Sequence, residues 1–146
     1  MSTIHKVIIG RLEKITLPQL HIHNLPVKVD TGAKTSSLHV DNICEYSRDA
    51  TPHVSFDLHP DTHQVKQSQH CHAPIKAIRK IKSSNGEIEV RYVIQTQIQL
   101  GAYSWEIEVT LADRSDMNYL MLLGREAMGK RFLVDPSKIF IGCRTQ

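Results

Sequence analysis

The sequence lacks any apolar stretch close to the roughly 20 residues that a membrane-spanning helix needs. No long apolar run follows its first residues, so we expect no secretory signal, no membrane partner and a cytoplasmic location. Cysteine is scarce, and Cys44, Cys71 and Cys143 are odd in number and share no close pair spacing. Free thiols in a reducing compartment are therefore expected rather than a disulfide framework.

Strong charge and cofactor motifs are absent as well. The formal net charge of +3 is weakly basic, and the chain has neither a basic run nor an aromatic platform, so we expect no nucleic-acid partner. The sequence contains no phosphate-binding glycine loop and no His-Glu-x-x-His motif. The residues therefore predict no cofactor.

What the sequence does contain is the pattern of a single all-β domain spanning residues 1–146. A hydrophobic content of 40% suffices for one core, and apolar residues alternate with polar ones in several short segments. The clearest alternation runs from Trp105 to Leu111. Many short strands separated by glycine turns predict a mainly β fold with one short helix, closed into a barrel or a sandwich.

Several turns and element ends can be placed from the residue pattern. Asn85-Gly86 is expected to close a hairpin between residues 78–82 and 88–94, because both residues tolerate the positive φ angles of the favoured turns. Gly101-Ala102 is expected to turn a second hairpin. Further expectations are a surface loop at 59–72, a short helix over Arg125–Gly129, and terminal strands at Phe132–Pro136 and Ile139–Gly142.

One motif carries catalytic chemistry. Asp30-Thr31-Gly32 directly follows a predicted strand that contains Val27 and Val29. In an aspartic protease two such loops each present a carboxylate to one water, and the two carboxylates share a proton because both cannot ionise easily at close range. One carboxylate takes a proton from the water while the other donates to the substrate carbonyl. The triplet alone also fits an ordinary turn, so the neighbouring segments decide between a catalytic loop and a structural turn.

The neighbouring segments resemble those of retropepsins. Val29–Ala33 is similar to the retropepsin active-site loop, and Met121–Arg125 is similar to the second retropepsin signature, an apolar pair followed by Gly-Arg. The hairpin over Ile81–Tyr92 stands where retropepsins place the flap that closes over substrate. The chain resembles most closely the RimB-like family, which is also labelled an ATP-dependent zinc protease. The segments that carry this resemblance are Lys28–His39, Phe56–Pro60, Arg91–Ile94, Trp105–Leu111, Met121–Arg125 and Phe132–Pro136.

The resemblance implies an acid-protease, retropepsin-type closed β-barrel that hydrolyses peptide bonds as a homodimer. The catalytic residues that it implies are Asp30, Thr31 and Gly32. Members of the family are often encoded near ATP-grasp ligases that add glutamates to proteins. Such a ligase is therefore implied as a functional partner, beside a peptide or protein substrate.

The resemblance also assigns supporting residues. Gly124 and Arg125 are expected to pack beneath the active-site loop as structural support. The residues expected to contact substrate are Ala33 and Lys34 in the loop and Ser84, Asn85 and Gly86 in the flap.

Two further expectations follow from the residues. The chain has a single Asp-Thr-Gly, so a pair of carboxylates requires two subunits that meet on a two-fold axis, with contacts expected at Val7–Gly10 and Ile139–Gly142. Viral retropepsins usually carry an aspartate where Lys34 stands, and lysine cannot accept a hydrogen bond from Arg125, whose acceptor is left open. Lys34 either favours acidic or glutamate-extended substrates or is a plain surface charge.

Two alternative functions stay open. One is a non-catalytic peptide-binding module on the same barrel, and the other is a zinc-dependent peptidase. The weak metal candidates are His70, Cys71 and His72, which lack the usual two-residue gap of structural zinc sites, together with His59 and His63. We expect these histidines to be solvated loop residues. His39 is expected at the rim of the loop, Asp57 at the surface and Asp113 at a strand end.

Overall fold

The computed structural model describes residues 6–58, 69–82, 85–113 and 119–142. These residues form a mainly β fold with one short helix, which confirms the predicted class. The elements are β1 (Val7–Leu17), the 3-10 turn η1 (Pro18–Leu20), β2 (Ile22–Asp30), β3 (Ser36–His39), β4 (Asp41–Arg48), β5 (Thr51–Leu58), β6 (Gln69–Pro74), β7 (Ala77–Lys82), β8 (Ile88–Leu100), β9 (Tyr103–Ala112), β10 (Met121–Gly124), α1 (Arg125–Met128) and β11 (Phe132–Ile139).

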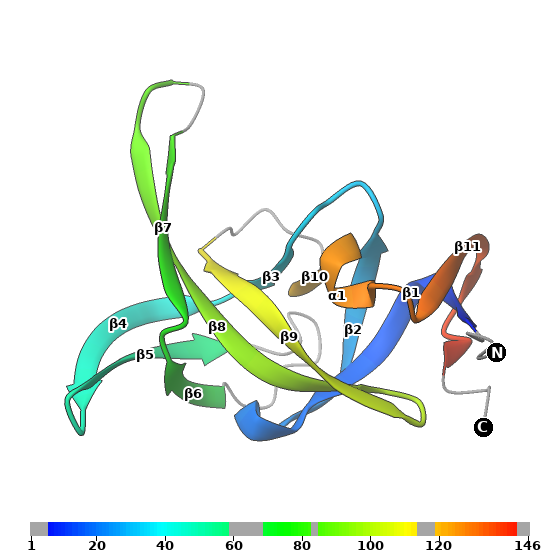
Figure 1. Cartoon of the computed structure of the whole chain (residues 1–146), viewed down its shortest axis with the longest axis horizontal. Coiled ribbons are helices and arrows are strands. Elements are labelled where there is room, and N and C mark those ends of the chain that lie inside the picture. Colours follow the sequence, from blue (N-terminus) through cyan, green and yellow to red (C-terminus); the bar gives the residue numbers. More distant parts are fainter. Residues whose placement is uncertain (1–5, 59–68, 83–84, 114–118, 143–146) are drawn as a thin grey trace, which may run out of the picture.

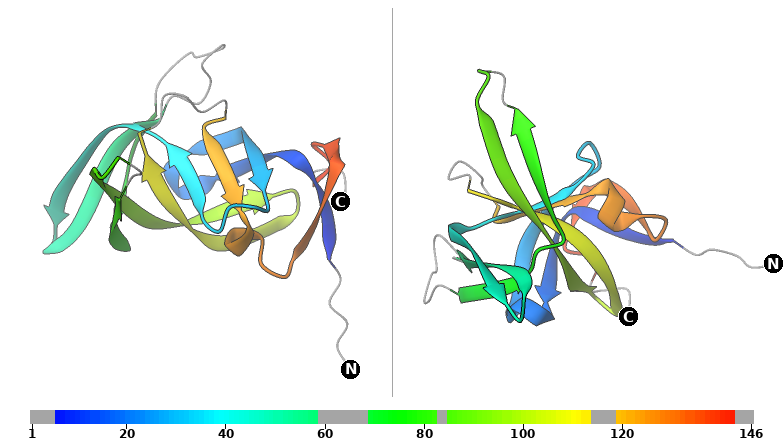
Figure 2. Two further views of the ribbon diagram at one scale, coloured as in Figure 1. Left: turned by 90° about the horizontal axis from the view of Figure 1, so that it is seen from above. Right: turned by 60° about the vertical axis from the view of Figure 1, so that its left-hand side comes forward.

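The main sheet closes into the predicted barrel. Its strand order is β11-β1-β2-β10-β3-β9-β8-β7, and an additional pairing of Thr16 with Gln99 joins β1 to β8. Six strands, from β1 through β2, β10, β3 and β9 to β8, therefore form a ring. The antiparallel strands β4, β5 and β6 form a second sheet at one end of the molecule, and β11 lies at the other end (Figures 1 and 2).

The predicted alternation along β9 is confirmed from Trp105 to Val109 and ends there, because Thr110 is buried as well. Trp105, Ile107 and Val109 are all buried, while the glutamates between them are exposed. The indole nitrogen of Trp105 donates a hydrogen bond to the Ala127 carbonyl oxygen at 2.8 Å. Trp105 therefore fills the core as expected and also fixes α1 against the barrel.

Both predicted hairpins form. β8 and β9 join through Gly101-Ala102, with Gly101 at φ +60°, as a two-residue loop with glycine in its first position requires. β7 pairs with β8 from Ala77–Val93 to Lys82–Ile88 and projects from the barrel as a long arm (Figure 1). The register pairs Lys82 with Ile88, and Gly86 between these strands takes a positive φ, 87°.

Two predicted segments are wrong. Residues 69–72 belong to β6 instead of a surface loop, because Cys71 and Ala73 alternate into the core while β6 pairs with β5; residues 59–68 lie outside the described part. Among the described residues from Phe132 to Gly142 there is one strand, β11, instead of two. After Ile139 the backbone leaves the strand through Phe140 at φ +53°.

The remaining expectations concern thiols and membrane spans. Cys44 and Cys71 are free thiols, as predicted, and Cys143 lies outside the described residues. Across the described residues, no helix has both the length and the apolar character that a membrane crossing demands.

Candidate active site

The Asp-Thr-Gly loop joins two strands that lie on either side of β10. Asp30 is the last residue of β2, and β3 begins at Ser36. β10 runs parallel to β2, with Gly124 in register with Asp30, and antiparallel to β3. The sheet thus brings the Gly-Arg segment, which lies about ninety residues later in sequence, directly beside the loop.

Hydrogen bonds within the loop orient the Asp30 side chain. The Gly32 amide donates to Asp30 Oδ1 at 2.9 Å, and the Ala33 amide donates to the Asp30 carbonyl oxygen at 3.2 Å. A Cβ on residue 32 would lie 3.2 Å from the same Oδ1, so glycine leaves this carboxylate oxygen open. Asp30 is half-buried, whereas Thr31 and Gly32 are exposed. The carboxylate is therefore held in place at a solvent-accessible surface.

The start of α1 binds the other half of the loop. The Arg125 amide donates to the Ala33 carbonyl oxygen at 2.8 Å, and the Glu126 amide donates to the Lys34 carbonyl oxygen at 3.1 Å. The Gly124 amide donates to the Ser36 hydroxyl at 3.0 Å. Amide groups at the first turn of a helix have no partner within the helix, so the loop carbonyls satisfy them.

The Arg125 side chain completes this support. Its Nη1 donates to the carbonyl oxygens of Gly32 at 3.2 Å and Thr31 at 3.5 Å. These main-chain oxygens are the acceptors that the sequence leaves unidentified. Lys34 Nζ instead lies 3.6 Å from Glu126 Oε1, in an ion pair whose two side chains are largely exposed.

Substituting Gly124 is expected to damage the loop. A Cβ at this position would lie 2.5 Å from the Thr35 carbonyl oxygen and 3.0 Å from that of Ala33, both main-chain atoms. Gly124→Ala should lower the free energy of unfolding by about 2 kcal/mol, because the backbone must shift. Ser36→Ala, which removes only the hydroxyl acceptor, should cost about 1 kcal/mol. Urea unfolding midpoints measure both, and a Gly124→Ala midpoint at or above that of Ser36→Ala would contradict this account.

The predicted flap residues belong to the β7–β8 hairpin and not to the Asp-Thr-Gly loop. Asn85 and Gly86 are exposed near the end of the β7–β8 hairpin, which projects on the same side of the barrel as the loop (Figure 1), and Ser84 lies outside the described residues. A cavity of about 140 Å³ lies between the loop and the base of this hairpin. Thr35, Ser36, Arg79, Glu108 and Glu126 are among the residues that line it.

Of the weak metal candidates, His59 and His63 lie outside the described residues, and His70, Cys71 and His72 do not converge on one point. Residues alternate along β6, so Cys71 points into the core while His70 and His72 are exposed. His70 Nδ1 lies 2.7 Å from Asp57 Oδ1, and Asp57 is half-buried rather than fully exposed as expected. Burial, with the nearby Asp57 charge, raises the pKa of Cys71 to about 11. A neutral, buried thiol is neither a ready zinc ligand nor a nucleophile.

A different group of side chains does come together. Ligand atoms of His39, Asp41 and Asp113 all lie within 4.8 Å of one another, so within the described residues these three could hold a cation. His39 and Asp41 are two residues apart in the sequence, but no local pattern shows that Asp113 lies beside them. Only the parallel pairing of β3 with β9, in which His39 is the register partner of Ala112, reveals it.

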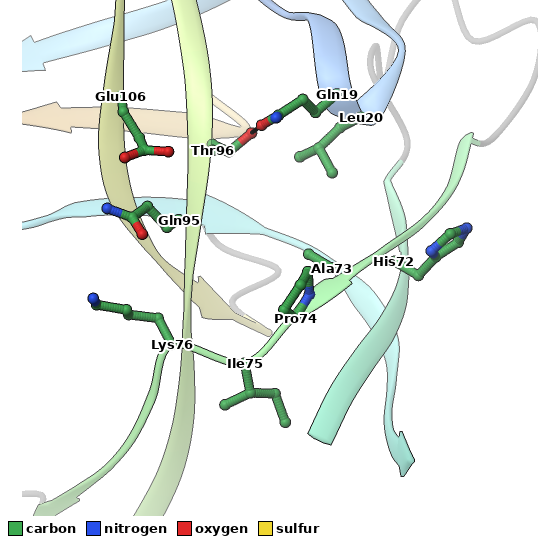
Figure 3. Close-up of a pocket in the computed structure, with 10 residues that line it drawn as sticks. All are labelled: Gln19, Leu20, His72, Ala73, Pro74, Ile75, Lys76, Gln95, Thr96 and Glu106. Carbon is green, nitrogen blue, oxygen red and sulfur yellow. Dashed lines mark hydrogen bonds between the residues drawn. The ribbon is translucent and has the colours of Figure 1, made fainter. Parts of the chain in front are cut away.

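A larger cavity of about 380 Å³ lies away from the loop (Figure 3). It is bounded by η1, the β6–β7 connection, β8 and β9, with Leu20, Ile75 and Lys76 among its lining residues. The Gln19 side-chain oxygen accepts hydrogen bonds from the Gln97 amide at 3.0 Å and the Thr96 hydroxyl at 3.4 Å. Gln19 thereby provides an acceptor for a backbone amide of β8, in the part of β8 that lies between the segment paired with β7 and the residue paired with β1.

A closed barrel with an Asp-Thr-Gly loop supported by a Gly-Arg helix start is the architecture of a retropepsin-like aspartic peptidase domain. Residues 8–145 match the RimB-like family, described as retropepsin-like aspartic endopeptidase RimB. The chain belongs to this family.

Other comparisons give related sequences and a related structure. A Shewanella halifaxensis protein is 49% identical over 136 residues, which are 93% of this chain and 30% of the relative. A Desulfotalea psychrophila protein is 43% identical over 134 residues, 92% of this chain and 29% of the relative. Both are named probable alpha-L-glutamate ligase, and the chain spans less than a third of their length.

A crystal structure from Legionella pneumophila, of a protein with unknown function, has a TM-score of 0.77 and 31% sequence identity. The match covers 93% of this chain and 98% of that chain.

Proposed function

We propose that the chain is an aspartic endopeptidase in which Asp30 activates the water that attacks the peptide bond. The observation that carries this proposal is the geometry of the Asp30 carboxylate, held by the Gly32 amide at 2.9 Å in a loop that Arg125 and α1 support. A fixed, solvent-accessible carboxylate is suited to general base catalysis. Retropepsin-like family membership supports the same chemistry.

The second carboxylate of this mechanism comes from a second copy of the chain. With one Asp-Thr-Gly per chain, two subunits must bring their Asp30 residues together on a two-fold axis, where the two acids share one proton. β11 is one edge strand of the sheet, and the register partners Ile8 and Leu133 on β1 and β11 are 49% and 51% exposed. An apolar sheet edge of this kind is suited to pairing with a second copy.

The substrate class is an acidic or glutamate-extended protein segment. Curated relatives that contain a sequence similar to this chain are named probable alpha-L-glutamate ligase. That link supports a reaction alongside glutamate ligation, with such a ligase as a partner. The free thiols Cys44 and Cys71 suit a reducing compartment, so we place the reaction in the cytoplasm.

Charge reversal at Lys34 tests the preference for acidic substrates. Lys34 is exposed beside Glu126, so Lys34→Glu places two carboxylates together at the mouth of the loop. The KM for an acidic peptide is expected to rise about threefold to fivefold, as exposed charges are worth little individually. Lys28→Glu, an equal charge change at an exposed position of β2, is the control. Equal KM values for the two variants would make Lys34 a plain surface charge.

The proposed activity is tested by incubating the purified chain with acidic peptides, with and without a chelator. Hydrolysis that survives the chelator supports the aspartic mechanism, because no metal takes part in it. Hydrolysis that is lost with the chelator and restored by zinc would instead support a zinc-dependent peptidase. A chain that stays monomeric at high concentration and hydrolyses nothing would support a peptide-binding module.

A further inference from the structure

Three possible metal ligands meet where β3 and β9 end. His39 is the last residue of β3, Asp41 is the first residue of β4, and Asp113 directly follows β9. Their ligand atoms, one imidazole nitrogen and two carboxylate oxygens, all lie within 4.8 Å of one another. Ligand atoms that share one zinc-like ion are about 3 to 4 Å apart, so small side-chain rotations bring these three onto a single ion.

The main chain holds these residues together without help from their side chains. β3 runs parallel to β9, with His39 in register with Ala112. Beyond that pair, the Val40 amide donates to the Ala112 carbonyl oxygen at 2.9 Å, and the Val40 side chain is buried in the core. The two chain segments therefore leave the sheet side by side, which places Asp41 next to Asp113. Ligands fixed by a rigid backbone lose little further freedom when an ion binds.

The charges at this position favour a cation. The carboxylates of Asp41 and Asp113 repel each other at this separation. Asp57, the register partner of Asp41 in the second sheet, adds a third acid nearby, although its own carboxylate contacts His70 at 2.7 Å. A protonated His39 carries one positive charge, whereas a divalent cation neutralises two carboxylates and also accepts the imidazole nitrogen as a ligand.

This position is separated from the candidate catalytic carboxylate by the length of β10. The His39 amide donates to the carbonyl oxygen of Leu120, the residue before β10, at 2.7 Å. Asp30 is in register with Gly124, the last residue of the same strand. Four residues of extended backbone, about 13 Å, lie between the two ends. An ion held by His39 is therefore not in a position to act on a water at Asp30.

The same ion would instead join two parts of the fold. His39 and Asp113 belong to the barrel, whereas Asp41 begins the strand that leads into the second sheet of β4, β5 and β6 (Figure 1). A polar contact between these parts, from the Tyr92 hydroxyl to Glu45 Oε1 at 3.0 Å, is exposed and contributes little stability. A metal ion at the junction would hold the second sheet to the barrel more firmly.

We propose that His39, Asp41 and Asp113 bind a divalent first-row transition-metal cation such as Zn²⁺, which fastens the second sheet to the barrel. A mixed set of imidazole and carboxylate ligands favours this class of ion over Ca²⁺ and Mg²⁺, which prefer oxygen ligands alone. The proposal is independent of the proposed peptidase function. A chelator should accordingly lower the thermal stability of the chain and leave any hydrolysis below the unfolding midpoint intact.

The test is isothermal titration of the full-length chain with Zn²⁺. One site is expected, and its affinity should fall at least about tenfold in His39→Gln and in Asp113→Asn, because each removes one ligand. His72→Gln and Cys44→Ser are the matched controls, since each removes an exposed metal-binding side chain outside the site. Both controls should bind Zn²⁺ as the wild-type chain does, and circular dichroism verifies that all four variants fold.

Thermal unfolding gives a second measurement of the same site. Saturating Zn²⁺ is expected to raise the midpoint of the wild-type chain and both controls by about 5 °C, with a smaller rise in His39→Gln and none with Mg²⁺. Asp30→Asn should bind Zn²⁺ like the wild-type chain, so a failure of the proposed catalysis leaves this result unchanged. Affinity that falls in both site variants and in neither control supports the metal site. Any other pattern overturns it, including a wild-type chain that binds no Zn²⁺ because the three side chains only pair with one another.

Discussion

Replacing Asp30 with asparagine is expected to lower kcat/KM for peptide hydrolysis by about a thousandfold or more. An amide has nearly the shape of the carboxylate but cannot take a proton from the attacking water or share one with a second acid. The Gly32 amide can still donate to the side-chain oxygen at this position, so the loop should keep its shape. Steady-state kinetics on an acidic peptide measure the loss.

The control for this substitution is Asp49→Asn. Asp49 is exposed in the turn between β4 and β5, where its φ of 52° suits asparagine as well as aspartate. The Asp49→Asn substitution changes the net charge by the same amount as Asp30→Asn and should leave kcat/KM unchanged. Comparable activities of the two variants would show that Asp30 has no part in the chemistry.

Replacing Glu13 with alanine is expected to cause the largest loss of stability, about 3 kcal/mol of the free energy of unfolding. Glu13 is fully buried, and its carboxylate accepts hydrogen bonds from three main-chain amides. The donors are Gly10 at 2.7 Å, Ile141 at 3.2 Å and Gly142 at 3.0 Å. Alanine would leave these amides without their acceptor and open a cavity.

A graded series separates charge from hydrogen bonding at this position. Glu13→Gln keeps one acceptor oxygen and should lose roughly half as much stability as Glu13→Ala. Glu106→Ala removes an exposed glutamate from β9 and should change stability little. Urea unfolding is followed at one fixed chain concentration, since dimerisation would shift the midpoint. Equal midpoints for Glu13→Ala and Glu106→Ala would contradict the structural role of Glu13.

The residues whose environment follows from local sequence were predictable. Alternation predicted β9, glycines marked both hairpins, and Arg125–Gly129 was expected as the short helix, whereas β3 was not predicted. Long-range pairing was not predictable in the same way. Glu13 stands between charged and apolar neighbours, and no local pattern shows that donors from residue 10 and from residues 141–142 converge on it.

The same limit applies within the candidate site. The loop and the Gly-Arg segment were recognised from their residues, but the carbonyl acceptors of Arg125 depend on the parallel pairing of β10 with β2. The sequence around Arg79 indicates only an ordinary strand charge, and the fold is needed to place it at the cavity that Thr35 and Ser36 also line. The expected strand at Ile139–Gly142 failed for a related reason, because the Glu13 carboxylate takes the amides that a strand partner would need.

The most direct test mixes wild-type chain with Asp30→Asn chain and measures peptide hydrolysis after the subunits have exchanged. If each active centre takes one acid from each of two copies, an equal amount of the variant should reduce the activity of the wild-type chain to about half, because random pairing leaves about half of its chains in wild-type dimers. A larger excess should suppress the activity almost fully. Wild-type activity that is indifferent to the added variant, under conditions where mixed dimers are detected by mass spectrometry, would contradict a shared catalytic centre.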